Sequence, residues 1–116
     1  MDDLFDCIVG AQLDSVTFVQ DYVQLHFDGP RLDAYTWPAV EIGDVCYRWG
    51  EQDYRNQLCE RIASIVARAS VIEGEVIRVE FSDGAVITIS LRAEDYCCAE
   101  AAMFSVNDGT SRWNVW

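Results

Sequence analysis

One apolar strand pattern occurs twice in this sequence, and it constrains the fold more than any other feature. The two copies lie 53 to 54 residues apart and read Val23-x-Leu25-x-Phe27-Asp-Gly and Ile77-x-Val79-x-Phe81-Ser-Asp-Gly. An apolar residue at every second position places those side chains on one face of a half-buried strand. The Asp-Gly pair that follows supplies the positive φ that a tight hairpin turn requires. Each copy is therefore predicted to form part of an antiparallel hairpin.

Both copies extend into a three-stranded meander, because further apolar stretches flank each of them. The strands are expected at 10–19, 22–27 and 31–37 in the first half and at 63–72, 75–81 and 85–91 in the second. A helix is expected before each meander. The first, at 2–9, would end at Gly10, and the second, at 51–62, has Tyr54, Leu58 and Ile62 on one side.

These elements predict an α+β fold. Two repeats, each a helix followed by a three-stranded meander, would form one antiparallel sheet or a pair of sheets, with a C-terminal hairpin after them. A length of 116 residues is that of one domain, so 1–116 is expected to be a single domain. Its repeat halves would cover about 1–50 and 51–92, and its C-terminal extension 93–116.

The segments outside the repeats are less regular. Residues 93–102 suit a short helix or a loop, and strands at 103–106 and 111–116 suit a hairpin around an Asn-Asp-Gly turn. Residues 36–50 are expected to form the longest irregular stretch, and they carry several aromatic residues. Long loops inside compact domains are often functional, so this stretch is a candidate binding segment.

The charge of the chain limits its partners. Twenty acidic residues stand against eight arginines and no lysine, for a formal net charge of −12. Residues 1–46 carry −8 of that charge and residues 47–116 carry −4. A field of this sign repels nucleic acid and anionic membranes and attracts basic surfaces. The sequence therefore predicts a basic protein partner, with no direct nucleic-acid binding and no membrane binding.

The cysteines and the N-terminus favour a cytoplasmic location. The five cysteines form an odd set without a CxxC pair, and two of them, Cys97 and Cys98, are adjacent. Adjacent cysteines suit a structural disulfide poorly, so buried, reduced thiols are expected. The acidic N-terminal segment lacks the apolar run of a signal peptide, and no stretch is long enough to span a membrane.

Catalytic signals are few. The sequence contains no nucleophile motif of the GxSxG type, no phosphate-binding glycine loop and no close cluster of zinc ligands. No cofactor and no metal are therefore expected. The paired carboxylates Glu73/Glu75 and Glu94/Asp95 fall at predicted turns or strand ends, where acids are usually solvated surface.

The single histidine, His26, supports one enzymatic alternative. It alternates with Leu25 and Phe27 and so is expected on the opposite face of its strand. Histidine is the favoured acid–base group near neutral pH. A small enzyme that uses His26 with Asp28 or Asp21 is therefore kept as an alternative to a binding protein.

A binding surface is predicted from the acidic first half and from the aromatic residues that follow it. Aromatic side chains and arginine contribute most of the binding energy at protein interfaces, and an acidic rim suits a partner rich in lysine and arginine. The predicted partner-binding residues are Asp14, Asp21, Asp28, Asp33, Tyr35, Trp37, Glu41, Asp44, Tyr47 and Trp49.

In size, charge and repeated Phe-(x)-Asp-Gly meanders over residues 10–91, the chain resembles the immunity proteins of bacterial polymorphic toxin and contact-dependent inhibition systems. The resemblance implies a non-enzymatic inhibitor that binds a cognate toxin, often a nuclease, and occludes its active site. The first alternative is a phage-encoded anti-defence inhibitor, of the anti-CRISPR or DNA-mimic kind, that binds a nucleic-acid-binding complex. The Val- and Ile-rich edge of the second meander also admits a homodimer.

Overall fold

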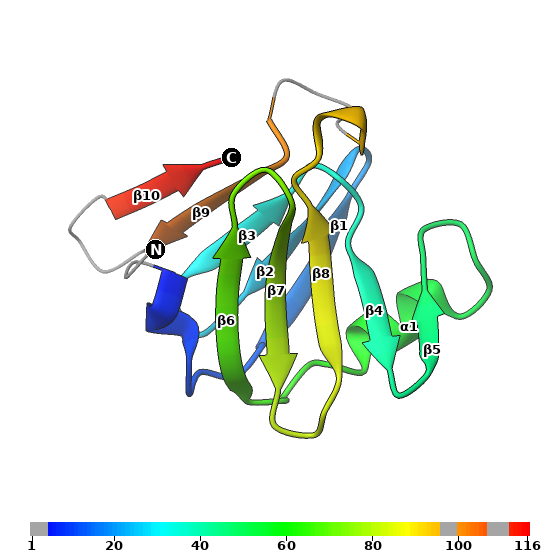
Figure 1. Cartoon of the computed structure of the whole chain (residues 1–116). Coiled ribbons are helices and arrows are strands. Elements are labelled where there is room, and N and C mark those ends of the chain that lie inside the picture. Colours follow the sequence, from blue (N-terminus) through cyan, green and yellow to red (C-terminus); the bar gives the residue numbers. More distant parts are fainter. Residues whose placement is uncertain (1–4, 96–99, 107–111) are drawn as a thin grey trace.

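The computed structural model describes residues 5–95, 100–106 and 112–116, and for 112–114 the backbone only. Ten strands form two five-stranded antiparallel sheets that pack face to face as a β-sandwich (Figure 1). The strands are β1 (Ser15–Val19), β2 (Tyr22–His26), β3 (Arg31–Ala34), β4 (Ala39–Ile42), β5 (Val45–Tyr47), β6 (Val66–Ile72), β7 (Val76–Phe81), β8 (Val86–Ser90), β9 (Ala102–Val106) and β10 (Arg112–Val115). The helical elements are the 3-10 turns η1 (Phe5–Ile8) and η2 (Ala93–Asp95) and the α-helix α1 (Tyr54–Cys59).

The two sheets have the same internal order. The first sheet runs β1-β2-β3-β9-β10, and the second, read from its opposite edge, runs β6-β7-β8-β4-β5. Each sheet therefore combines the three-stranded meander of one half of the chain with a two-stranded hairpin from the other half (Figure 1). The two halves are related by a pseudo-twofold arrangement in which they exchange their C-terminal hairpins.

The strand registers show how closely the halves correspond. In the first sheet, Leu32 on β3 lies between Leu25 on β2 and Phe104 on β9. In the second sheet, Ile87 on β8 lies between Val79 on β7 and Val40 on β4. All six side chains are fully buried between the sheets. The period-2 alternation of the sequence thus supplies the core from both sides.

The six strands of the two meanders are confirmed, and so is the C-terminal hairpin, as β9 and β10. The predicted α+β class is wrong, because the chain is mostly β, with a single short α-helix in the described residues. None of the described helices is long and apolar enough to cross a membrane.

Both expected helices are shorter than their sequence patterns indicate. In the predicted 51–62 helix, α1 covers six residues, begins after a left-handed Asp53 that makes no side-chain cap, and ends at Cys59. The next turn tightens through bonds from Ile62 N–H to the Cys59 carbonyl and then reverses at Ala63, which has a φ of 78°. Of the predicted 2–9 helix, the described part is the 3-10 turn η1, which stops before Gly10 at a φ of 89°. Each helix thus ends before a residue of positive φ whose backbone N–H bonds to the other segment: Gly10 to the Val66 carbonyl and Ala63 to the Leu13 carbonyl.

The expectation of an irregular stretch at 36–50 is also wrong, since β4 and β5 occupy its centre. They pair as a hairpin, with Ile42 opposite Val45 across the turn residues Gly43 and Asp44. Gly43 has a φ of 60°, which a two-residue hairpin turn requires. The Gly-Asp pair between short apolar stretches was a readable turn signal.

Candidate functional site

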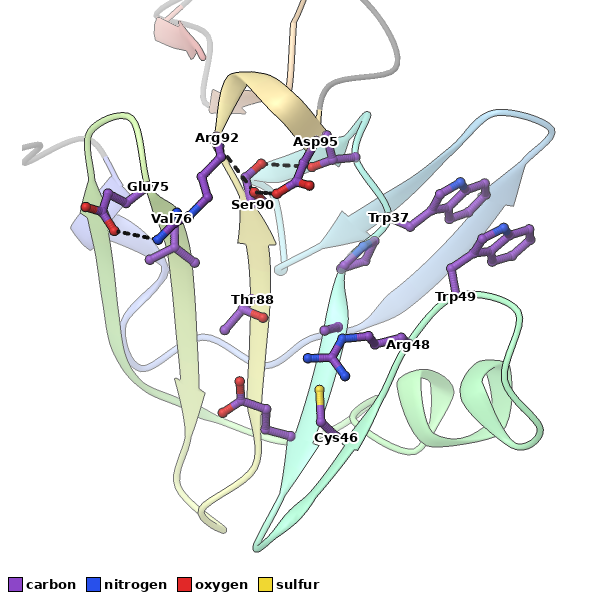
Figure 2. A pocket seen from close by; sticks show the side chains of 14 residues that line it. Trp37, Cys46, Arg48, Trp49, Glu75, Val76, Thr88, Ser90, Arg92 and Asp95 are labelled. Atoms are coloured by element: carbon purple, nitrogen blue, oxygen red, sulfur yellow. Dashed lines mark hydrogen bonds and ion pairs between the residues drawn. The ribbon is translucent and has the colours of Figure 1, made fainter.

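A groove of about 560 Å³ lies on the outer face of the second sheet (Figure 2). Its floor consists of outward-facing residues of the central strands, including Ala39 and Glu41 on β4 and Thr88 and Ser90 on β8. Thr88 and Ser90 alternate with Ile87 and Ile89, which face the core. The alternation that builds the core therefore also places small polar side chains on the groove floor.

Hydrogen bonds fix one end of the groove. The Ser90 hydroxyl donates to Asp95 Oδ2 at 2.6 Å and accepts from the backbone N–H of Arg92 at 3.2 Å. The Arg92 guanidinium lies 3.4 Å from Glu75 Oε1, which ties η2 to the start of β7 (Figure 2). Thr36 Oγ1 donates to the Ser90 carbonyl at 3.0 Å from the segment that leads into β4.

At the other end of the groove, Arg48 and Glu41 make no ion pair with any described residue. Figure 2 shows the Arg48 guanidinium and the Cys46 sulfur directed into the groove. The backbone of Arg48 is held by its N–H, which donates to Glu51 Oε1 at 2.6 Å. The backbone at this end is thus fixed, whereas the Arg48 side chain is exposed.

An aromatic stack forms the side wall of the groove. The Trp37 and Trp49 rings are parallel, with centroids 3.8 Å apart. The Arg55 guanidinium lies 4.9 Å from the Trp49 ring and 5.9 Å from the ring of Phe18 on β1. The buried Tyr54 hydroxyl donates to the Pro38 carbonyl behind the stack. Through Arg55, the stack therefore connects β1, the edge strand of the first sheet, to the second sheet. It has a structural role, and its Trp49 ring is also exposed.

Three of the ten predicted partner-binding residues, Trp37, Glu41 and Trp49, line the groove. Trp49 is 42% exposed, whereas Trp37 is half-buried against the core. Tyr47 also packs against the core, from β5.

The other predicted binding residues lie elsewhere. Asp14 Oδ2 accepts a bond of 3.1 Å from the Asp28 backbone N–H, so these two acids share one end of the sandwich. Asp21 occupies the β1–β2 turn and Asp44 the β4–β5 turn. Asp33 belongs to β3, and Tyr35 directly follows that strand and contacts Tyr22 on β2 with ring centroids 5.2 Å apart. The ten residues therefore do not share one face, because the exchange of hairpins separates segments that are close in sequence.

Asp33 is buried on the outer face of its sheet, with 2% of its surface exposed. Its Oδ1 lies 3.0 Å from Arg31 Nε, although the N–H is not aligned as a hydrogen bond, so the contact is an ion pair. Burial raises the pKa of the Asp33 carboxyl above its usual value, and the Arg31 charge offsets that effect only in part.

Asp33→Asn is expected to raise the free energy of unfolding at pH 7. The raised pKa means that the folded state binds a proton more tightly than the unfolded state, so the ionised carboxylate lowers stability as pH rises. The advantage of the variant should disappear as pH falls below the range in which Asp33 ionises. Urea unfolding of both proteins from pH 3 to pH 8 measures the difference. A variant that is less stable at pH 7 would mean that the Arg31 ion pair outweighs the cost of burial.

His26 lies half-buried on the outer face of β2, beside a hollow of about 360 Å³ that Arg31 and Ser105 also line. Within the described residues it forms no ion pair with an acid. Asp28 follows in the β2–β3 turn, while Asp21 lies at the other end of the strand. The geometry thus provides no aligned acid–histidine pair in the described part.

No group of three or more metal-ligating side chains is present among the residues that the structure describes. The expectation of buried cysteines is wrong for Cys7 and Cys59, which are exposed, while Cys46 is half-buried in the groove. Cys97 and Cys98, like the Asp108 turn, lie outside the described residues.

The groove residues that were not predicted as a site include the polar side chains of Arg48, Thr88, Ser90 and Arg92. Glu75 and Asp95 were considered only as solvated carboxylates. Small polar residues at alternate positions of an Ile-rich strand were a usable signal for an outward face. What lies beside that face depends on the pairing of β4 with β8, which no local pattern indicates.

No family model matches the chain, and no curated protein or solved structure matches it either. The function is therefore inferred from charge and geometry.

Proposed function

We propose that this chain is a cytoplasmic, non-enzymatic binding protein of the immunity type, which neutralises a basic toxin such as a nuclease by occluding its active site. Nuclease active sites are basic because they bind phosphate, so an acidic inhibitor matches their charge. The resemblance in size, charge and repeat pattern to immunity proteins motivates the toxin as the partner.

The observation that carries this proposal is the surplus of surface carboxylates without an ion pair. Seventeen acidic residues are described, and only five of them form ion pairs within the described chain. Five of the seven arginines with described side chains are engaged in those same pairs. The remaining twelve form no ion pair with a cation whose side chain is described, so their field extends into solvent and favours an external basic surface.

The distribution of these acids suits rapid capture. Asp14 and Asp28 lie at one end of the sandwich, and Asp21 and Glu73 lie in the β1–β2 and β6–β7 turns. Charges spread in this way steer a basic partner from many directions, and a small set of anchors then determines how tightly it stays bound. The Trp49 ring beside the groove is one such anchor, because it is large, rigid and exposed.

The test is capture of host proteins on the immobilised protein, followed by association kinetics with the purified capture product. We expect a basic protein whose association rate falls by about tenfold or more between 50 mM and 500 mM salt. Restored growth on co-expression with that protein, if it is toxic, would support inhibition. A control variant that changes Asp14, Asp21, Asp28 and Asp44 to Asn reduces the net negative charge from −12 to −8 and should therefore lose part of the salt dependence.

The identity of the captured protein separates the alternatives. A toxic nuclease supports the immunity function, whereas a nucleic-acid-binding defence complex supports the phage anti-defence alternative. Capture of acidic or neutral proteins only, with rates that do not respond to salt, would contradict both.

A further inference from the structure

The internal repeat provides a matched comparison for the groove. Asp33 and Met103 are neighbours across β3 and β9 of the first sheet, and the corresponding neighbours across β8 and β4 of the second are Thr88 and Ala39. Two residues further along the same faces, the contacting pair Tyr22 and Tyr35 of the first sheet corresponds to the paired residues Val76 and Ser90 of the second. Both pairs of each sheet lie on its outer face, because they alternate with residues that face the core.

Side-chain size explains why the second sheet is hollow there. On the first sheet, Asp33 is 2% exposed, with Met103 and Gln24 as its neighbours on the adjacent strands, Arg31 in ion-pair contact and the tyrosine pair further along the same face. On the second sheet, the small side chains of Ala39, Thr88 and Ser90 leave a groove of about 560 Å³. That volume lies within the range of protein pockets that enclose a ligand group. The groove is thus a difference between two otherwise equivalent faces.

The charged groups that face the groove favour a cation. Three carboxylates, Glu41, Glu75 and Asp95, and two guanidinium groups, Arg48 and Arg92, line it. Glu75 already holds Arg92 at 3.4 Å, and Asp95 accepts the Ser90 hydroxyl. Glu41 on the floor has no cationic partner within 4.0 Å among the described residues.

Arg48 is the group that a cationic ligand would displace. Its side chain is exposed and forms no ion pair with a described residue, so it can turn away from the groove without breaking one. Its charge nevertheless repels a second cation while it remains there.

We propose that the groove receives an arginine or lysine side chain of the basic protein partner, with Glu41 as its carboxylate and Arg48 as an internal competitor. The inference rests on the proposed function and names the place where the partner is bound. Steering depends on the whole acidic surface, whereas this contact depends on the shape of the groove and on the charge of Glu41.

Two groups of variants test the proposal. Ala39→Met and Thr88→Met fill the groove without changing the net charge, and methionine already occupies the position equivalent to Ala39 on the first sheet. Glu41→Gln removes the proposed carboxylate, and Arg48→Gln removes the competitor. The matched control is Ala67→Met, at an exposed position of β6. Thermal melts establish that each variant folds.

The probe is the capped peptide acetyl-Gly-Arg-Gly-amide, titrated into the full-length ¹⁵N-labelled protein, with acetyl-Gly-Glu-Gly-amide as its counterpart. We expect saturable shifts of the Glu41, Cys46, Thr88 and Ser90 amides with the arginine peptide only. Glu41→Gln should weaken binding by roughly threefold to fivefold, as for one partly exposed ion pair. Arg48→Gln should strengthen it, and the groove-filling variants should abolish the saturable shifts while Ala67→Met leaves them unchanged.

Other outcomes overturn the proposal. Shifts scattered over both sheets, or shifts that persist in Ala39→Met and Thr88→Met, would show that the cation binds by surface charge alone. If Glu41→Gln strengthened binding and Arg48→Gln weakened it, the groove would bind an anionic group and not a cationic one. If the groove-filling variants fail to fold, the Glu41 and Arg48 variants still show whether the groove binds a cationic or an anionic group.

The partner assay separates this inference from the proposed function. If Ala39→Met captures the same basic protein with unchanged affinity, the groove inference fails and the proposed function stands. If the wild-type protein captures no basic protein, the proposed function fails whatever the peptide titration shows.

Discussion

Expressed separately, residues 1–50 and 51–116 are expected to be unfolded, and mixing them in equal amounts should restore the fold. The two halves exchange hairpins, so β4 and β5 of the first half have their sheet partner, β8, in the second half. In the same way, β9 pairs with β3 of the other half. Neither half alone can therefore complete a sheet.

The energetic reason is that each half would expose the apolar face of its meander. Val23, Leu25 and Phe27 are fully buried in the intact chain, as are Ile77 and Val79 of the second half. Burying such a side chain stabilises the fold by about 1.5–3 kcal/mol, and net domain stability is only about 5–15 kcal/mol. Without the burial of these side chains, a single half loses more stabilising free energy than the net stability of a whole domain provides.

Circular dichroism and ¹⁵N–¹H spectra measure this outcome. Each fragment should show a collapsed amide spectrum without a cooperative melt, and the mixture should reproduce the dispersed spectrum of the intact chain. A mixture of one fragment with a scrambled version of the other is the control. A cooperative melt of either half alone would show that the exchanged hairpin is dispensable.

Phe104→Ala is expected to lower the free energy of unfolding by about 3–5 kcal/mol, the usual cost of a large aromatic cavity in a core. Phe104 is fully buried on β9, the strand that the second half contributes to the first sheet. Its ring meets Phe5 of η1 edge to face, with centroids 5.2 Å apart and an interplanar angle of 83°. One side chain thus connects the two halves and the N-terminal turn.

Urea unfolding of the wild-type protein and of the variant measures the loss. Phe104→Leu should cost less, because much of the buried area remains. Phe18→Ala on the edge strand β1 is the matched control, since Phe18 is only half-buried, and it should also cost less. A loss below about 1 kcal/mol for Phe104→Ala would mean that the site collapses around the smaller residue.

The candidate site was predictable only in part. Trp37, Glu41 and Trp49 were recognised because aromatic and acidic residues cluster in that part of the sequence. Thr88 and Ser90 were not, because an outward-facing small residue becomes a groove only when its neighbouring strands carry no bulk above it. Here that neighbour is Ala39, about fifty residues earlier in the chain, placed there by the β4–β8 pairing.

By itself, the sequence determined the two meanders, their turns, the final hairpin and the acidic charge. Side-chain alternation and Asp-Gly turns act over a few residues, and net charge is independent of fold. Only the tertiary structure decided the lengths of the helices, the sheet that each hairpin joins, and the groove. Those features depend on contacts between strands far apart in the chain, such as β3 with β9 and β4 with β8, which local patterns do not specify.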